Sequence, residues 1–258
     1  MEPYPPCWGA PNLELPLMRR QLMKLLLPSE QARTMMFQTA DALRRADAGE
    51  AGAYSLARIL TPLIKFRACR DAISAARASM ETRGGNGYIE EWVNSRLVRD
   101  SHIGVLWEGT SNINAIDVVK RAVFKAKAHE ALHALLQEKV AQVPLLPEAF
   151  RQRLLRVADK SFEFISAVAA APESEHMARQ ATTAFYNAAS AVVLAWESIQ
   201  EHGDPRKLLI SRFVLEHRLE PIDPLSPPDG QWEHAAYSIL LSDEDDVTLD
   251  DTLALIAS

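Results

Sequence analysis

The sequence predicts an all-α protein, an antiparallel bundle of helices followed by a helical C-terminal extension. Apolar side chains recur three or four residues apart through most of the chain, which is the spacing of one helix face. Only 10 of the 258 residues are glycine, whereas alanine, the best helix former, is frequent. No segment alternates apolar and polar residues over the length that a half-buried strand needs. We therefore expect helices joined by loops, and no sheet.

Proline is expected to divide the first helical segment. Apolar residues at helical spacing extend over residues 14–46 and are interrupted by Pro28. Proline in a helix interior removes a backbone hydrogen bond and clashes with the preceding turn. We therefore expect two helices here, one over residues 14–27 and another over residues 29–46.

Glycines, prolines and capping residues bound the remaining helices. A long helix over residues 52–80 is expected to end at the glycine-rich turn of residues 84–87, where a positive φ is needed. A further helix should begin near Ser111, with Thr110 or Ser111 as its N-cap. The second half of the chain should add helices over residues 147–170, over residues 177–202, and from Asp204-Pro205 onward.

The composition is that of an ordinary globular protein, with 48% hydrophobic and 24% charged residues. No apolar run is as long as a bilayer span, and the first residues lack the basic and apolar regions of a secretory signal. The two cysteines, Cys7 and Cys69, are too few for a disulfide framework. We therefore expect a cytoplasmic protein without a membrane segment.

The formal net charge of −6 is unevenly spread along the chain. Residues 150–258 hold 9 Lys and Arg against 18 Asp and Glu, a charge of −9, and the remainder carries +3. A protein that grips nucleic acid needs a basic surface. The acidic second half argues against a nucleic-acid partner, although a local basic patch on the first half stays open.

A proline-rich step at residues 144–147 marks the expected domain boundary. Residues 1–143 would form the helical bundle, and residues 144–258 a helical extension packed on it. The tail is acidic from Asp243 to Asp251 and is expected to be solvated.

Residues 81–121 carry most of the candidate functional residues. They read ETRGGNGYIEEWVNSRLVRDSHIGVLWEGTSNINAIDVVKR. Glu108 follows Trp107, precedes the flexible Gly109 and stands where a helix is expected to begin. A carboxyl group beside an aromatic ring and short of water has a raised proton affinity, which suits a general base. The plainer interpretation is a carboxylate favoured by a helix N-terminus.

One short motif matches a zinc-site pattern. Residues 129–133 read His-Glu-Ala-Leu-His, in which two histidines share a helix face and a glutamate stands between them. Five-residue patterns recur by chance, and no third-ligand motif is visible. We therefore expect no metal site here, and a polar face of an ordinary helix instead.

From about Trp8 to Phe124 the chain resembles the C-terminal helical domain of acyl-CoA dehydrogenases. Three motifs carry the resemblance, and they occur in the family's order and spacing: GGNGY, RLVRD and WEGTSNIN. Further details resemble the alkylation-response branch of the family, namely PLMRRQL at residues 16–22, TPLIK at residues 61–65, the Glu90-Glu91 pair and Asp117.

The resemblance implies α,β-dehydrogenation of an acyl-CoA thioester with FAD. Glu108 occupies the position of the family base, and its own backbone N–H is implied to help polarise the thioester carbonyl. Trp107 and Gly109 are implied to lie against the substrate. FAD contacts are implied for Glu81, Gly84, Gly85, Thr110, Ser111 and Asn112. The first three would face the flavin pyrophosphate across a subunit interface, so a homo-oligomer is implied as well.

Two departures from the family pattern bear on this function. The family's N-terminal helical domain and middle β-barrel are not seen in the sequence, and Pro5 stands where a flavin-contacting arginine is usual. We therefore expect a part of an enzyme, or a subunit whose partner chain supplies those domains. Glu81 stands where a neutral amide commonly faces a diphosphate. A carboxylate there repels phosphate unless a cation such as Arg83 pairs with it.

Two other functions stay open. A non-catalytic helical interaction module is favoured by the missing domains and the missing arginine. Protection from alkylation damage through nucleic-acid binding follows from the branch resemblance, and the acidic second half disfavours it.

Overall fold

The structure is a computed structural model that describes residues 12–226, 230–242 and 247–257. The regular elements of these residues are all helices, and the described ranges contain no strand, so the expected all-α class is confirmed. The expectations for Pro5 and Trp8, and for residues 243–246 of the acidic tail, lie outside the described residues.

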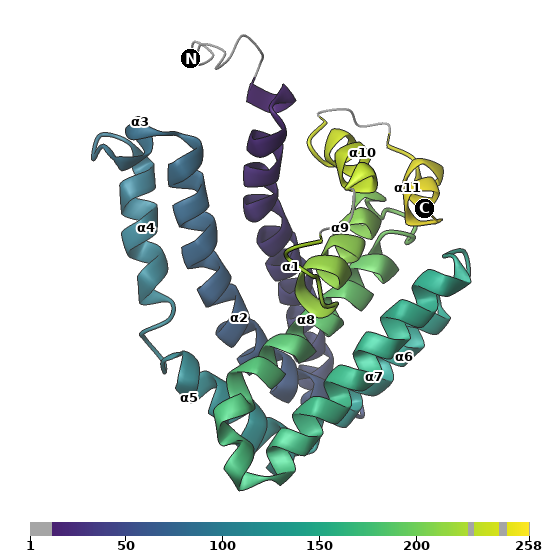
Figure 1. Cartoon of the computed structure of the whole chain (residues 1–258). Coiled ribbons are helices and arrows are strands. Elements are labelled where there is room, and N and C mark those ends of the chain that lie inside the picture. The colour runs from purple at the N-terminus through teal and green to yellow at the C-terminus, as the bar shows by residue number, and fades with distance from the viewer. Residues whose placement is uncertain (1–11, 227–229, 243–246, 258) are drawn as a thin grey trace.

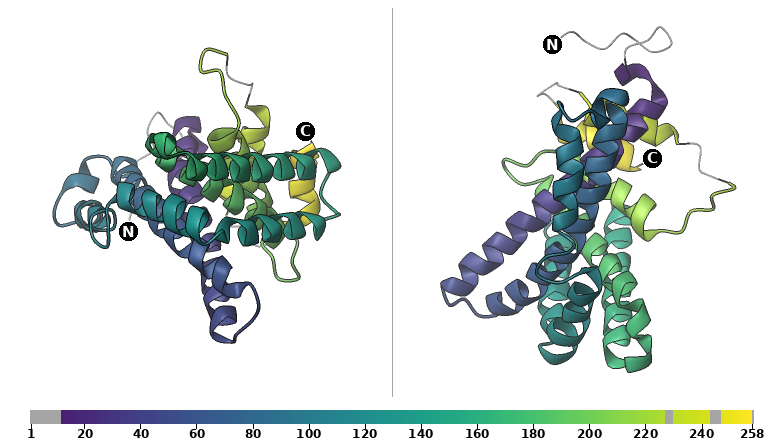
Figure 2. Two further views of the ribbon diagram at one scale, coloured as in Figure 1. Left: turned by 90° about the horizontal axis from the view of Figure 1, so that it is seen from below. Right: turned by 90° about the vertical axis from the view of Figure 1, so that its left-hand side faces the viewer.

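Two long antiparallel helices form the frame of the first half (Figure 1). They are α1 (Pro16–Asp47), preceded by the single turn η2 (Asn12–Glu14), and α2 (Ala53–Thr82). After α2 the chain turns through α3 (Gly85–Tyr88), and α4 (Val93–Ile103) returns alongside α2 (Figures 1 and 2). Then come α5 (Ser111–Ile116), with Thr110 as its N-cap as expected, and the π-helix η3 (Asp117–Lys125).

The second half wraps around one central helix. The helices α6 (Ala128–Ala141) and α7 (Glu148–Ala170) lie side by side in antiparallel fashion (Figure 2). The short 3₁₀ helix η4 (Pro172–Met177) then leads into the central helix α8 (Ala178–Glu197). The remaining elements are α9 (Arg206–Val214), the π-helical turn η5 (Leu215–Leu219), α10 (Gln231–Leu240) and α11 (Leu249–Ala257).

The expected break at Pro28 is wrong, because α1 continues through this residue without interruption. A proline inside a helix costs one backbone hydrogen bond and a clash with the preceding turn, and burial of its ring offsets part of that cost. Pro28 is buried, and the hydroxyl of the next residue, Ser29, donates to the carbonyl of Leu25 at 2.7 Å. Tertiary packing therefore overrides the local preference of proline for a helix start.

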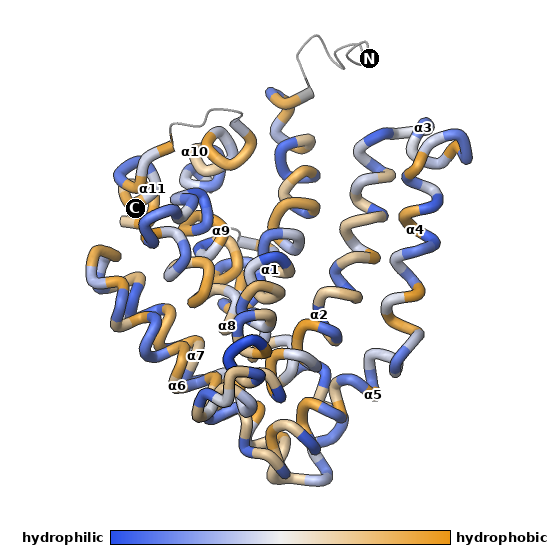
Figure 3. The backbone as a smooth tube through the Cα atoms, turned by 180° about the vertical axis from the view of Figure 1, so that it is seen from behind, coloured by the Kyte–Doolittle hydropathy of each residue, from blue (hydrophilic) through white to orange (hydrophobic). Residues whose placement is uncertain are grey.

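The central helix α8 is buried more completely than its sequence pattern predicts. The sequence indicates one apolar side, but every residue from Phe185 to Ala195 is buried. Five of these eleven residues are alanine or serine, small side chains that let neighbouring helices come close. Along the outer helices, by contrast, hydrophobic and hydrophilic residues alternate turn by turn (Figure 3).

A buried polar contact joins α1 to α8. The Gln31 side-chain amide donates to Asn187 Oδ1 at 3.2 Å and to Ser190 Oγ at 2.8 Å. All three residues are buried, so water cannot replace a lost partner, and the contact fixes the register between the two helices.

Both predicted segments contribute to one hydrophobic core. The core cluster joins Met35, Leu60 and Val119 of the first segment to Phe185 and Phe213 of the second. Helix α8 packs against α1, α2 and α5, and so the second segment lies directly against the first. The boundary at residue 144, which falls between α6 and α7, stays a prediction.

The two histidines of the His-Glu-Ala-Leu-His motif face the neighbouring helix α7. Both imidazoles stack on the ring of Phe162, with centroid distances of 5.0 Å for His129 and 4.2 Å for His133. His133 Nε2 lies 2.7 Å from Asp159 Oδ1. The expected polar face is wrong for His129, which is 3% exposed. Among the described residues no cluster of three or more His, Cys, Asp or Glu is arranged to hold a metal ion.

None of the helices in the described ranges combines the length and the apolar character that crossing a bilayer requires.

Acidification should weaken the α6–α7 contact through His129. Burial lowers the pKa of the His129 imidazole below its ordinary value of 6.5. The unfolded chain then binds the proton more readily, so this contribution is present above pH 6.5 and is lost as the pH falls through that value. We expect His129→Phe, which keeps a ring against Phe162, to lose less unfolding free energy than the wild type between pH 7 and pH 5.

Urea denaturation at several pH values measures this difference in slope. The His133–Asp159 pair is present in both proteins and cancels in the comparison. Identical pH dependence in the two proteins would contradict the role of His129.

Candidate functional site

Glu108 lies in the loop between α4 and α5, three residues before α5 begins. Its φ is +55°, and the φ of the next residue, Gly109, is +98°. The left-handed region costs a residue with a side chain about 1–2 kcal/mol. A Cβ added at Gly109 would lie 3.1 Å from Ile113 Cγ2, so both the backbone and the space there favour glycine. The loop therefore holds Glu108 in a strained conformation.

Two side chains fix the backbone on either side of Glu108. The Lys65 ammonium group, on α2, donates to the carbonyls of Gly104 at 2.6 Å and Trp107 at 3.0 Å. The Asn114 amide, on α5, donates to the carbonyl of Gly109 at 2.6 Å and also to that of Thr110 at 3.1 Å. The residues immediately before and after Glu108 are thus each tied to a different helix.

The Glu108 carboxylate itself is free. Within the described part of the chain it makes no hydrogen bond or ion pair, and its side chain is exposed. The neighbouring Trp107 ring is 64% exposed. The expectation of a carboxyl group short of water is therefore wrong for this chain alone, because no described residue covers the loop. The helix that follows Glu108 begins at Ser111, as expected.

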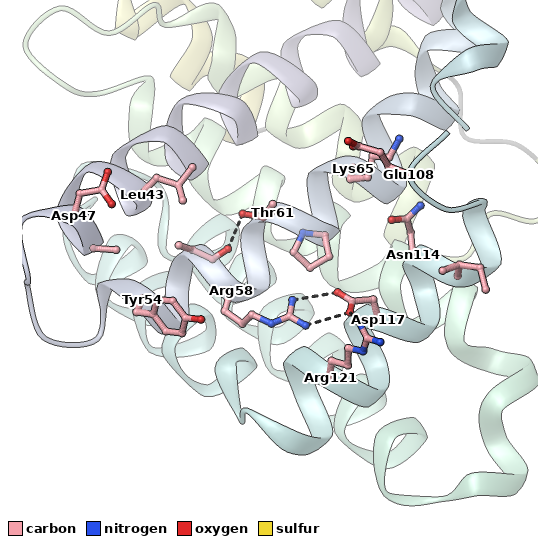
Figure 4. A pocket seen from close by; sticks show the side chains of 14 residues that line it. Leu43, Asp47, Tyr54, Arg58, Thr61, Lys65, Glu108, Asn114, Asp117 and Arg121 are labelled. Atoms are coloured by element: carbon pink, nitrogen blue, oxygen red, sulfur yellow. Dashed lines mark hydrogen bonds and ion pairs between the residues drawn. The ribbon is translucent and has the colours of Figure 1, made fainter. Parts of the chain in front are cut away.

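A cavity of about 560 Å³ opens beside Glu108. It lies between the C-terminal end of α1, the first half of α2, and the helices α5 and η3. Figure 4 shows Glu108 and Lys65 at one end of this cavity, and Arg58 facing Asp117. Arg58 binds both carboxylate oxygens of Asp117, at 3.1 and 3.2 Å, and Arg121 approaches Asp117 at 3.4 Å. The other lining residues are Leu43, Ala46, Asp47, Tyr54, Ala57, Thr61, Pro62, Ile113 and Asn114.

The predicted FAD-contacting residues fall into two groups at opposite ends of α4 (Figure 1). Glu81, Gly84 and Gly85 lie where α2 turns into α3, whereas residues 110–112 begin α5. Helix α4 has 11 residues, which at a rise of 1.5 Å per residue is roughly 16 Å. The structure does not bring the two groups together within one chain. Thr110 and Asn112 are exposed, Ser111 is half-buried, and Asn112 Oδ1 accepts from Arg179 at 3.4 Å.

The cation that pairs with Glu81 is Arg77, not Arg83. Arg77 Nη1 lies 3.2 Å from the Glu81 carboxylate, and the Gln21 amide donates to the same carboxylate at 3.0 Å. The signal was present in the sequence, because Arg77 and Glu81 are four residues apart on one helix. The glycine turn beside them is open, with no atom within 4 Å of a Cβ added at Gly84 or Gly85.

Sequence reasoning missed the roles of Lys65, Asn114 and the Arg58–Asp117 pair. Lys65 and Asp117 were noticed only as parts of motifs, without a function. Asn114 follows Thr110 by one helical turn, a position from which an amide reaches back to the N-cap carbonyl. The contacts of Lys65 and Arg58 span 39 to 59 residues, and no local pattern indicates them.

Replacing Lys65 should loosen the loop that carries Glu108. Lys65→Met keeps the apolar stem but removes both hydrogen bonds, and we expect a loss of about 1–2 kcal/mol in unfolding free energy, since one of the two bonds is exposed. Amide hydrogen exchange should accelerate at residues 105–109. Lys160→Met, an exposed change on α7, is the matched control. Unchanged exchange in the loop would contradict the anchoring role.

Glu108→Gly should stabilise the chain. Glycine adopts a positive φ without the steric cost that a side chain imposes, so we expect a gain of about 1 kcal/mol in unfolding free energy. Glu108→Gln keeps the side chain and the strain while removing the charge, and it should leave the stability unchanged. Urea denaturation compares the three proteins; equal stability of the glycine and glutamine variants would show that the loop is unstrained.

A family model and a curated relative both indicate similarity to the same family, the acyl-CoA dehydrogenases. The model of the acyl-CoA dehydrogenase C-terminal domain matches residues 6–124. AidB of Escherichia coli (strain K12), which is named as an acyl-CoA dehydrogenase, is 34% identical over 146 residues. That match covers 56% of this chain and 26% of AidB, so the chain spans about a quarter of the length of this curated relative.

Two solved structures share the fold over nearly the whole chain. ACDH-11 of Caenorhabditis elegans, solved in complex with C11-CoA, has a TM-score of 0.75 at 17% identity and matches 95% of this chain and 43% of its own. The acyl-CoA dehydrogenase of Bacillus anthracis, solved in complex with FAD, has a TM-score of 0.66 at 17% identity and matches 98% of this chain and 50% of its own. At these identities the likeness concerns the fold. Residues 6–124, which hold the loop of Glu108, thus match the C-terminal helical domain of the acyl-CoA dehydrogenase family.

Proposed function

We propose that this chain is the base-carrying C-terminal part of an FAD-dependent acyl-CoA dehydrogenase-like protein. The observation that carries the proposal is the state of Glu108, an unpaired carboxylate at the edge of a 560 Å³ cavity, on a loop anchored on both sides. A general base needs a free carboxylate held at a fixed place. The backbone of Glu108 is also strained, and residues with strained backbones cluster at functional sites.

In this proposal Glu108 removes the α-proton of an acyl-CoA thioester. The backbone N–H of Glu108 has no acceptor among the described residues, so it is available to donate to the thioester oxygen. Such a donor stabilises the negative charge that develops on that oxygen as the proton leaves. Trp107 and Gly109 flank the base and are proposed to line the substrate. FAD, when bound, supplies the acceptor for the hydride from the β-carbon.

The residues proposed to hold FAD fit an extended, phosphate-bearing molecule. Gly84 and Gly85 leave their backbone open to a neighbour, and Thr110 and Asn112 present exposed polar side chains. Arg77 and Gln21 offset the charge of Glu81, which lowers the repulsion between its carboxylate and a phosphate group. Because the two groups lie at opposite ends of α4, they are proposed to serve one cofactor from two different chains.

The surface of α3 and α4 supports an assembly. From residue 88 to residue 107 the chain exposes large apolar side chains that no described residue covers, and monomers rarely leave such a group in water. They are Tyr88, Ile89, Val93, Leu97, Ile103, Leu106 and Trp107. We propose that a second copy, or a partner chain with the domains not seen here, covers this surface and excludes water from Glu108. The cytoplasm remains the proposed compartment.

A non-catalytic interaction module is the second candidate. The same apolar surface favours it, because docking a partner requires no base. Flavin content separates the two functions. A purified assembly with a flavin absorbance band supports the dehydrogenase, and a stable oligomer that stays colourless after addition of FAD supports the module.

Replacing Glu108 should remove catalysis without removing the cofactor. In the flavin-containing assembly we expect Glu108→Gln to lower dehydrogenation of acyl-CoA by about 10²–10⁴-fold, the usual contribution of a positioned base. The absorbance band of the flavin should be unchanged. Glu130→Gln, an exposed change on α6, serves as the control. Full turnover by Glu108→Gln would reject this residue as the base.

A further inference from the structure

A second cavity is lined by basic side chains, far from Glu108 in the fold. It encloses about 220 Å³ between the first half of α1, the α9–η5 segment and α10, the elements at the upper right of Figure 1. This volume corresponds to about seven water molecules at ~30 Å³ each. Its lining residues are Arg20, Met23, Lys24, Leu27, Phe213, His217, Arg218 and Tyr237.

The charge of this lining is one-sided. Four of the eight residues are basic, and none of the described residues that line the cavity is Asp or Glu. The chain as a whole carries −6, and its second half, which contributes His217 and Arg218, is the acidic one. A local excess of positive charge in such a protein is not a consequence of composition.

Three of the basic groups lack an anionic partner. Neither Arg20 nor Arg218 makes a hydrogen bond or a close ion pair with any described residue, although Glu233 lies near enough to Arg20, and Asp71 to Arg218, for their charges to interact. Lys24 donates to the neutral Gln21 Oε1 at 2.9 Å. The N–H donors of these three groups are therefore available to an anionic ligand.

The nearby carboxylates already have partners, and Glu233 is bound by two residues of the cavity lining. On η5, Glu216 and Glu220 face α7 and bind Arg153, at 3.3 and 2.8 Å, while Arg218 of the same turn lines the cavity. Glu233 accepts from His217 at 2.9 Å and from the Tyr237 hydroxyl at 2.8 Å.

Asp71 pairs with Arg67 on α2. Partial burial and the neighbouring Arg67 lower the pKa of the Arg218 guanidinium, whereas Asp71 raises it.

The floor of the cavity is apolar and buried. Met23, Phe213 and Tyr237 are buried beneath the charged groups, and Phe213 and Tyr237 stack with a centroid distance of 5.7 Å. Buried rings below exposed cations form a site that accepts an anion together with a short apolar stem.

We propose that this cavity binds a small anion of the phosphate class, with Arg20, Lys24 and Arg218 as its donors. Guanidinium groups bind phosphate oxygens through two parallel hydrogen bonds, and the ammonium group of Lys24 adds a third point of charge. The ligand is free phosphate or pyrophosphate, or the phosphate of an organic molecule whose stem lies on the apolar floor. This inference does not rest on the dehydrogenase function, because it concerns other elements and other residues.

Titration of the purified full chain with pyrophosphate, inorganic phosphate and hexyl phosphate tests the proposal by calorimetry. We expect saturable binding at one site, weakened by salt because the contacts are ionic. Arg218→Gln and Lys24→Gln should each weaken it about tenfold or more. Tighter binding of hexyl phosphate than of inorganic phosphate would assign an organic ligand, and the reverse order a free anion.

Arg156→Gln on α7 is the matched control, since it removes one exposed positive charge away from the cavity. It should change the affinity by less than about twofold. Thermal unfolding confirms that the variants are folded, which is expected because both replaced side chains are exposed. Absence of saturable binding by all three anions, or equal weakening by Arg156→Gln, would overturn the proposal.

Discussion

The burial of α8 on all sides is the constraint on which the rest of the structure depends. Small side chains let a surrounded helix approach its neighbours closely, and the polar groups that it carries inward need partners. Alanines and serines meet the first condition, and Gln31 meets part of the second by binding both Asn187 and Ser190. Because α8 packs against α1, α2 and α5, it supports the helices from which the candidate site is built.

This chain supplies only part of the candidate site, namely the anchored base without the cover that would exclude water from it. Its positions are fixed, since Lys65 and Asn114 hold the carbonyls on both sides of Glu108. The surroundings of the carboxylate are incomplete, since Glu108 and Trp107 remain exposed to water. Fixing a base and desolvating it are separate physical tasks, and this chain performs the first. The exposed apolar surface of α3 and α4 lies in the same segment and indicates where the second is completed.

Local sequence patterns predicted those features that local physics controls. The helix expected over residues 52–80 exists as Ala53–Thr82, because its ends depend on nearby glycines. Thr110 occupies the expected N-cap position of α5, although its side chain makes no capping hydrogen bond. Pro28 failed as a helix end because burial outweighed its local cost. The exposure of Glu108 and the contacts of Lys65 depend on segments distant in sequence, so no spacing rule gives them. The π-helix η3 (Asp117–Lys125) likewise follows no local sequence pattern described above.

The strained backbone of Glu108 has a consequence for how the sequence changes over generations. At a position with φ of +55°, random substitution to glycine or asparagine is favoured by stability, whereas glutamate is disfavoured. Under neutral drift a protein that sits near its stability threshold accumulates the favoured residues at such positions. The stability cost of a glutamate there must therefore be offset by a benefit to the organism outside the folding of this domain, and its loss in a descendant lineage would mark the point where that benefit ended.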